Sequence, residues 1–162
     1  TATANRAHSL LTHIQYLPGT RADGSVDEAA LIAWIEEARR LAKEFGRLES
    51  ADRMIGELLY SKQIGSDGVW PSEPIREALE HVRSRAMAGG MSLATYNGRG
   101  VTWRGEGGQQ ERDLAASYER HASALAYSHP FVSQMLQQIA EFYQRDAVHE
   151  DASAAANRRL RR

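Results

Sequence analysis

Apolar residues recur every three to four positions along most of the chain, which is the spacing of one buried face of an α-helix. The clearest run follows the stretch "PGTRADGS" and ends at Gly46. Its apolar positions are Leu31, Trp34, Ile35, Ala38, Leu41, Ala42 and Phe45. Ser25 stands where a capping residue is expected, and Glu28 follows three positions later, as in a capping box. The pattern therefore predicts a helix that begins after Ser25 and ends at Gly46, with Trp34 in the core.

The same spacing predicts the remaining elements. Further helices are expected over about residues 4–17, 50–59, 74–88, 109–126 and 130–152. Pro74 suits the first turn of its helix, because the N–H it lacks would be unpaired there. Gly89-Gly90 is expected to interrupt that helix, and "MSLATY" then forms a short helix of its own.

The fold class follows from these elements. No segment alternates convincingly between apolar and polar residues at period two, so the sequence predicts an all-α protein. We expect an irregular multi-helix bundle of about six helices. A short α-solenoid is the weaker alternative, because no self-similar motif repeats at 33–47 residues.

Length and composition bound the organisation of the chain. Its 162 residues suit one domain, which we place at residues 1–150, with residues 151–162 as an Arg-rich frayed helix end or linker. Cysteine is absent, which excludes disulfides and thiolate metal sites. No apolar run approaches the length of a membrane span. The chain begins "TATANRAHSLL" without Met or a signal pattern, so we expect a cytoplasmic domain of a larger protein.

The stretch "NGRGVTWRGEGGQQER" contains the main candidate site. Its glycines would let the backbone of residues 97–108 approach a ligand, and the helix that starts near Gln109 would present free N–H groups to an anion. Together with a tryptophan in the preceding long loop, the candidate binding residues are Trp70, Asn97, Arg99, Thr102, Trp103, Arg104 and Arg112.

Acidic residues in the same stretch weaken the anion hypothesis. Glu106, Glu111 and Asp113 place negative charge where a phosphate would bind, and Glu111 can instead fold back to the N–H groups of the first helical turn. The spacing matches no phosphate-binding motif, and no strand precedes it. A structural connector with Trp103 packed over it is therefore favoured over a protein-interaction surface, and that surface over a small-ligand site.

The sequence offers no catalytic or metal-binding pattern. None of the six histidines has metal-ligand spacing, and no serine lies in a nucleophile motif, so we expect no enzyme activity, metal or cofactor. Four of the 20 basic residues lie in the final "NRRLRR", and the remaining 16 face 21 acidic residues. The body is thus mildly acidic, which disfavours nucleic-acid binding.

Three stretches carry a resemblance. "PGTRADGSVDEAALIAWIEEARR", "GVWPSEPIREALE" and "NGRGVTWRGEGGQQERDLAASYERHA" resemble a region of large actinobacterial proteins of undefined function, over roughly residues 9–150. The resemblance implies a bacterial origin and a helical, C-terminal location in a longer chain. It implies no activity, cofactor or site.

These observations favour a non-enzymatic helical protein-interaction domain of a larger bacterial protein. Its partner would be another protein or another domain of the parent chain, bound at the surface that carries Trp70, Arg99, Trp103 and Arg104. One alternative is a small-ligand or nucleotide sensor that uses residues 97–108. A second is nucleic-acid contact through the Arg-rich C-terminus, and this alternative ranks last.

Overall fold

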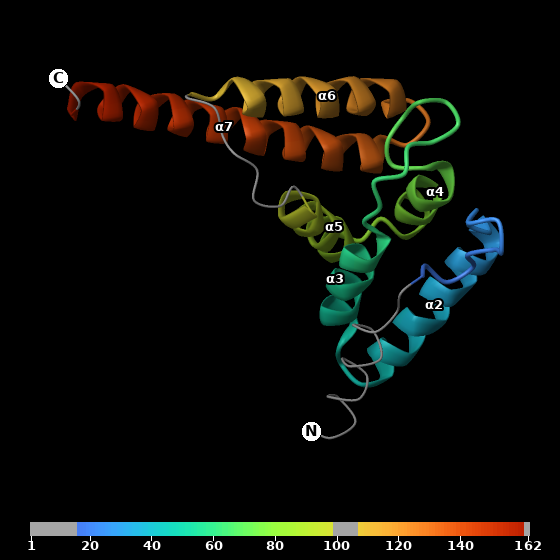
Figure 1. The fold of residues 1–162 in the computed structure, drawn as a ribbon. Coiled ribbons are helices and arrows are strands. Elements are labelled where there is room, and N and C mark those ends of the chain that lie inside the picture. Colours follow the sequence, from blue (N-terminus) through green and yellow to red (C-terminus); the bar gives the residue numbers. More distant parts are fainter. Residues whose placement is uncertain (1–15, 99–106, 161–162) are drawn as a thin grey trace.

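The computed structural model describes residues 16–98 and 107–160 and shows an all-α fold, as predicted (Figure 1). The helices of this part of the chain are α2 (Glu28–Glu44), α3 (Leu48–Leu59), α4 (Glu73–Val82), α5 (Arg85–Gly98), α6 (Gln109–Leu125) and α7 (Pro130–Leu160). Within these described residues, extended pairing is limited to an isolated bridge between Thr20 and Val26. The helix predicted over residues 4–17 lies outside the described residues except for its last two positions.

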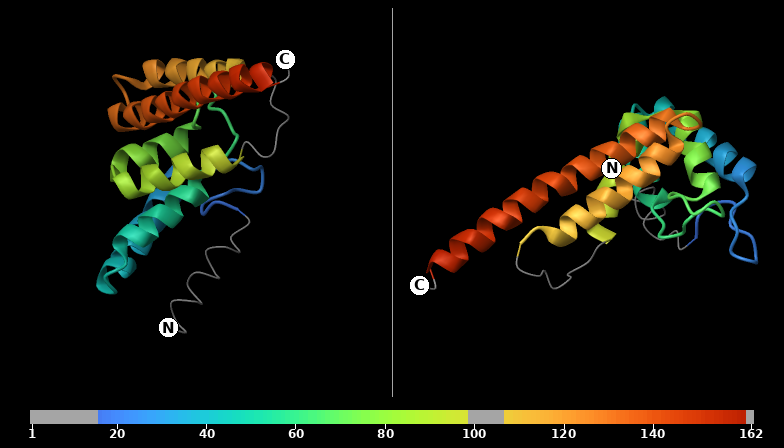
Figure 2. Two further views of the ribbon diagram at one scale, coloured as in Figure 1. Left: turned by 90° about the vertical axis from the view of Figure 1, so that its left-hand side faces the viewer. Right: turned by 90° about the horizontal axis from the view of Figure 1, so that it is seen from above.

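The helices stack in tiers (Figures 1 and 2). The antiparallel α6–α7 hairpin forms one outer tier, α4 and α5 lie beneath it, and α2 and α3 lie farthest from the hairpin. The largest fully buried apolar side chains come from five of the six helices, and they are Leu31, Ile35, Ile55, Leu59, Ile75, Leu79, Met87, Met91, Met135, Leu136 and Ile139. One continuous core therefore joins the tiers.

Two helix starts differ from the prediction. The N-cap of α2 is Asp27, whose carboxylate accepts from the N–H of Ala30, whereas Ser25 bonds to Asp23 in the preceding turn. The α3 helix begins at Leu48, before the predicted cap at Ser50. Before α2, Asp23, Ser25 and Asp27 stand close together, and only the path of the entering chain selects Asp27. The N-cap of α3 is Arg47, which makes no side-chain capping bond.

The predicted apolar face of α2 is only partly buried. Leu31 and Ile35 are fully buried, but Trp34 is half-buried, Leu41 is 43% exposed and Phe45 is 75% exposed. Trp34 packs against the core but is not fully buried, so its prediction as a core residue is confirmed only in part. On another flank of α2, an ion pair joins Arg39 to Asp52 of α3, and a hydrogen bond joins Glu36 to His81 of α4.

The Gly89-Gly90 pair does not interrupt a helix, contrary to the prediction. It lies inside α5, which crosses α3 at backbone contact. A Cβ atom on Gly90 would lie 2.0 Å from the carbonyl oxygen of Arg53, and one on Gly56 would lie 1.9 Å from that of Met87. Glycine is required at both positions because a side chain would hold the two helices apart.

The last helix extends further than predicted. The periodicity predicts fraying beyond Ala152, but α7 continues to Leu160, with Ala154 only 9% exposed. The side chain of Asp151 accepts a hydrogen bond from the N–H of Gly108 at 2.8 Å, which links this part of α7 to the start of α6. In the part of the chain that the structure describes, no helix is long and apolar enough to cross a membrane.

Candidate functional site

A pocket of about 210 Å³ opens where the segment that joins α3 to α4 meets α6. We call it the seam pocket, because it lies between the α6–α7 hairpin and the other helices. Its lining residues are Tyr60, Ser61, Lys62, Ile64, Trp70, Leu114, Ser117, Tyr118 and His121. Most of the lining is aromatic or aliphatic, with a few polar groups among it.

One face of α6 supplies a wall of the pocket. Leu114, Ser117, Tyr118 and His121 follow the i, i+3, i+4, i+7 spacing that places side chains on one side of a helix. The opposite wall comes from residues 60–70, which follow the end of α3. The pocket thus exists only because two segments about 50 residues apart in the sequence pack together.

Trp70 is the buried anchor of this wall. Its side chain is only 6% exposed, and its indole N–H donates to the carbonyl oxygen of Ser61 at 2.7 Å. The ring meets Tyr118 edge to face with 5.7 Å between centroids, and Tyr118 stacks in turn on Tyr143 of α7 at 5.7 Å. The loop tryptophan is therefore part of the core that also lines a pocket, and not an exposed contact residue.

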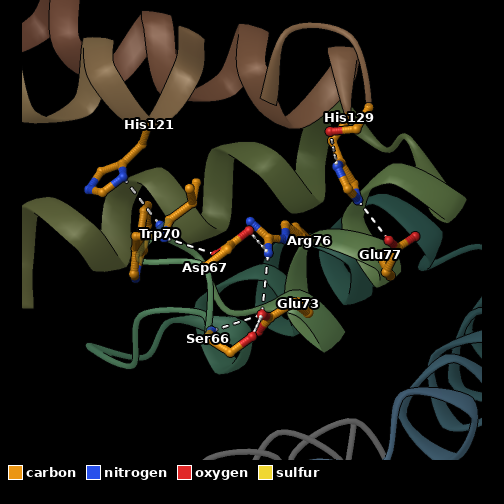
Figure 3. Close-up of polar contacts among 10 residues, drawn as sticks. Ser66, Asp67, Trp70, Glu73, Arg76, Glu77, His121 and His129 are labelled. Carbon is orange, nitrogen blue, oxygen red and sulfur yellow. Dashed lines mark hydrogen bonds and ion pairs between the residues drawn. The ribbon is translucent and has the colours of Figure 1, made fainter. Parts of the chain in front are cut away.

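His121 joins the two walls. The backbone N–H of Trp70 donates to Nδ1 of His121 at 3.3 Å, and Figure 3 shows the imidazole reaching from α6 toward Trp70. Because Nδ1 is the acceptor, the neutral ring carries its proton on Nε2. Burial lowers the pKa of His121, Arg120 lowers it further, and Asp67 opposes them. The ring is therefore neutral at pH 7.

Buried Arg76 holds the segment in shape from behind. Its guanidinium, 4% exposed, lies 2.5 Å from Asp67 and 3.6 Å from Glu73, between the two carboxylates in Figure 3. Asp67 also accepts a hydrogen bond from the backbone N–H of Val69. This bond and the bond from the Arg76 guanidinium both lower the pKa of the Asp67 carboxyl. The hydroxyl of Ser66 bonds to Glu73 and lowers the pKa of that carboxyl. These contacts set the position of the pocket wall.

A second polar group, at the turn between α6 and α7, resembles a catalytic triad only in its order of contacts. His129 bonds through Nδ1 to Ser128 and through Nε2 to Glu77, each at 2.8 Å (Figure 3). The nearby N–H groups of Phe131 and Val132 already donate to Glu80 of α4, so they are not free to stabilise an oxyanion. The group therefore fastens α4 to the hairpin.

The candidate residues from the sequence are not all in one place. Arg99, Thr102, Trp103 and Arg104 lie outside the described residues. Asn97 is an exposed residue in the last turn of α5. Neither Asn97 nor Arg112 lines the seam pocket, whereas Trp70 does.

Arg112 lies at the start of α6 in a site that carboxylates already fill. Its guanidinium is 2.7 Å from Asp151, which also accepts from the N–H of Gly108. Glu111, in the first turn, is only 1% exposed. Carboxyl groups of the chain itself therefore occupy the position that the sequence suggested for an anion.

The described glycines of the predicted loop serve packing and turning. A Cβ on Gly98 would lie 2.3 Å from the hydroxyl of Tyr60, and one on Gly108 would lie 2.2 Å from the carbonyl oxygen of Ala147. Gly107 adopts a positive φ of 90° at the start of α6. At these three positions glycine has a structural reason that needs no ligand.

Several lining residues were not predicted from the sequence. Lys62, Ser117 and His121 each stand apart in the sequence, and no motif marks them. The available signal was the helical spacing of residues 114, 117, 118 and 121, but it indicates only a shared face. Within residues 16–98 and 107–160, no cluster of His, Asp and Glu could hold a metal ion.

The comparisons with known proteins add no assignment. No protein-family model matches this chain, and neither a curated protein nor a solved structure matches it. Function has to be inferred from the residues themselves.

Proposed function

We propose that this chain is a non-enzymatic helical interaction domain of a larger bacterial protein, and that its seam pocket receives a side chain of a protein partner. The observation that carries the proposal is the pocket itself, an opening of about 210 Å³ lined mainly by aromatic and aliphatic groups. Protein-binding anchors characteristically enter small pockets of this kind.

The size of the pocket favours a protein partner over a free cofactor. Pockets for drug-sized ligands and cofactors measure roughly 300–1,000 Å³ and enclose most of the ligand. The seam pocket is smaller, which suits one anchoring residue, with the remaining contacts spread over the surface around it. Ile64 lines the pocket yet keeps 54% of its surface exposed, so it can contact a partner outside the cavity.

Contacts within the chain hold the walls of the pocket in place. Trp70, Tyr118 and Arg76 are held by the hydrogen bond, ring contacts and ion pairs described above. A preformed pocket lowers the cost of ordering side chains when a partner binds.

Selection of peptides tests the proposal. A library of random peptides with free C-termini is selected on the immobilised domain, and the affinities of enriched peptides are then measured for variants. We expect Ile64→Asp to weaken binding at least tenfold, about 1.4 kcal/mol. Leu93→Asp on α5 is the matched control, because Leu93 is 44% exposed and does not line the pocket.

The two variants separate the outcomes. Loss of binding in Ile64→Asp alone supports the seam pocket as the contact site. Enriched peptides that bind Ile64→Asp as tightly as the unchanged domain would contradict the proposal, and so would a selection that enriches no peptide.

A further inference from the structure

The polar groups of the seam pocket share one property, which is that they can donate hydrogen bonds. They are the ammonium of Lys62, the hydroxyls of Ser61, Ser117, Tyr60 and Tyr118, and the imidazole of His121. Among the residues that the structure describes, no carboxylate lines the pocket, although the whole chain has more acidic than basic residues. A ligand that accepts hydrogen bonds or carries negative charge is therefore complementary to it.

His121 is a donor because its other nitrogen is already used. Nδ1 accepts from the backbone N–H of Trp70, which leaves the proton on Nε2. Burial and the charge of Arg120 both keep the ring neutral at pH 7 by lowering its pKa. The Nε2–H group forms no hydrogen bond with the described residues.

Lys62 supplies the positive charge. Its side chain is exposed, and within the described part of the chain it forms no ion pair or hydrogen bond. The hydroxyl of Tyr118 keeps its proton as well, because burial raises the pKa of this phenol. Lys62 and Tyr118 therefore present donors that no acceptor of the described chain takes.

The carboxylate that acts on the pKa of His121, that of Asp67, is already paired. Asp67 influences His121, but its oxygens accept from the N–H of Val69 and from the guanidinium of Arg76. Glu73, on the far side of Arg76, accepts from Ser66. Neither carboxylate is available to Lys62 as a partner without loss of contacts that hold the loop.

We infer that the seam pocket binds an apolar residue that carries its own free carboxylate, namely the C-terminal residue of a partner peptide chain. The inference rests on the proposed function and names the chemistry of the partner. The aromatic and aliphatic walls contact the side chain, while Lys62 and the other donors of the lining bind the carboxylate.

The volume of the pocket favours a C-terminal residue over an internal acidic one. A pocket of about 210 Å³ must hold both the apolar group and the negative charge. A C-terminal leucine-like residue combines them in a single residue, whereas an internal pair of an apolar and an acidic residue brings two side chains and a continuing backbone. Capture of a terminal carboxylate is also a recurring mode of peptide recognition.

Three small probes test the inference on the complete chain. They are N-acetyl-leucine, N-acetyl-leucinamide and the α-amide of N-acetyl-aspartic acid. The last probe keeps the side-chain carboxylate of aspartate but has an amide in place of the C-terminal carboxylate. The readout is the NMR signal of the Trp70 indole N–H, assigned with Trp70→Phe, with the Trp34 indole as an internal control. We expect N-acetyl-leucine to shift the Trp70 signal with a Kd at least tenfold lower than that of either other probe.

The two lysines of the chain provide a matched pair of variants. Lys62→Gln should weaken N-acetyl-leucine to the level of its amide, because the carboxylate loses its cation. Lys43→Gln should leave the affinity unchanged, because Lys43 is exposed in the last turn of α2 and does not line the pocket. Both changes are at exposed positions, so neither is expected to affect folding.

Each outcome has a separate meaning. Equal binding of N-acetyl-leucine and its amide would overturn the role of the carboxylate in binding. It would leave the proposed docking of an apolar side chain intact. Equal binding of N-acetyl-leucine and the α-amide of N-acetyl-aspartic acid would assign the pocket to acidic side chains and overturn the inference of a C-terminal residue. If no probe shifts Trp70, the inference is refuted, and the peptide selection still decides the proposed function by itself.

Discussion

Two contacts in this molecule are built in opposite ways. Where α3 crosses α5, glycines bring the backbones together, and hypothetical Cβ atoms on Gly56 and Gly90 would lie about 2 Å from carbonyl oxygens. Where α4 meets the α6–α7 hairpin, side-chain hydrogen bonds make the connection, from Glu77 to His129 and from Glu80 to the first N–H groups of α7.

The difference explains where the pocket can be. A contact through glycine leaves no space between two helices, and it tolerates no added atom. A contact through long polar side chains keeps the elements farther apart, and aromatic rings fill the remaining space only in part. The seam pocket lies between the α3–α4 connection and α6, where a hydrogen bond to a side chain, from the backbone N–H of Trp70 to His121, again joins the hairpin to the rest of the molecule.

The largest effect is expected where α3 and α5 touch. Gly90→Ala should destabilise the protein by about 3 kcal/mol or more, because the added methyl would meet the backbone of Arg53 and not a movable side chain. Denaturant unfolding measures this change.

Gly89→Ala is the control for that variant. No atom lies within 4 Å of a Cβ at Gly89, so alanine should raise stability by about 0.5–1 kcal/mol through helix propensity. Equal effects of the two substitutions would show that the α3–α5 contact is not formed through the backbone.

A smaller loss is expected at the polar seam. Glu80→Ala removes the carboxylate that accepts from Phe131 and Val132, and should cost about 2 kcal/mol. Hydrogen exchange should increase in α6 and α7 more than in α3 and α5. Glu57→Ala, an exposed change on α3, is the control. If hydrogen exchange instead increases equally in all helices, the contact between α4 and the hairpin does not open separately from the rest of the fold.

Acid should loosen the pocket wall before it unfolds the helices. The folded-state pKa values of Asp67 and Glu73 lie below their ordinary values of 3.8 and 4.5. Their contribution to stability is therefore complete above the ordinary values, and it is lost as the pH falls through the lowered ones.

Two measurements follow this loss. The Trp70 indole signal should change below about pH 4, at a higher pH than the loss of helical circular dichroism. Asp67→Asn should reduce the dependence of the Trp70 signal on pH. A single transition that is common to both signals would mean that the seam and the glycine contact unfold together.

The smallest effects are expected at the rim of the pocket. Ile64→Asp and Leu93→Asp should have the smallest effects on the free energy of unfolding, about 0.5 kcal/mol each, because about half of each residue is already exposed to solvent. Thermal unfolding of the two variants checks this. A large loss in Ile64→Asp would mean that Ile64 supports the fold, and its use as a binding variant would then fail.

The sequence predicted much of the fold but little of the site. Periodicity and breakers placed the starts of α4 near Pro74 and of α6 at Gln109, because these signals are local. The lining of the seam pocket could not be predicted in the same way. His121 matters only because Trp70 lies beside it, and no local pattern connects two residues so far apart in the sequence.

The sequence by itself determined that the chain is helical, through apolar spacing that suits buried helix faces and excludes strands. Only the tertiary structure decided which glycines are breaks and which are contacts. Gly90 remains in a helix because a neighbouring backbone packs against it, and that packing offsets its low helix propensity. The tertiary structure also decided that Trp70 is buried and that donors gather beside it, since both depend on the distance between separate segments after folding.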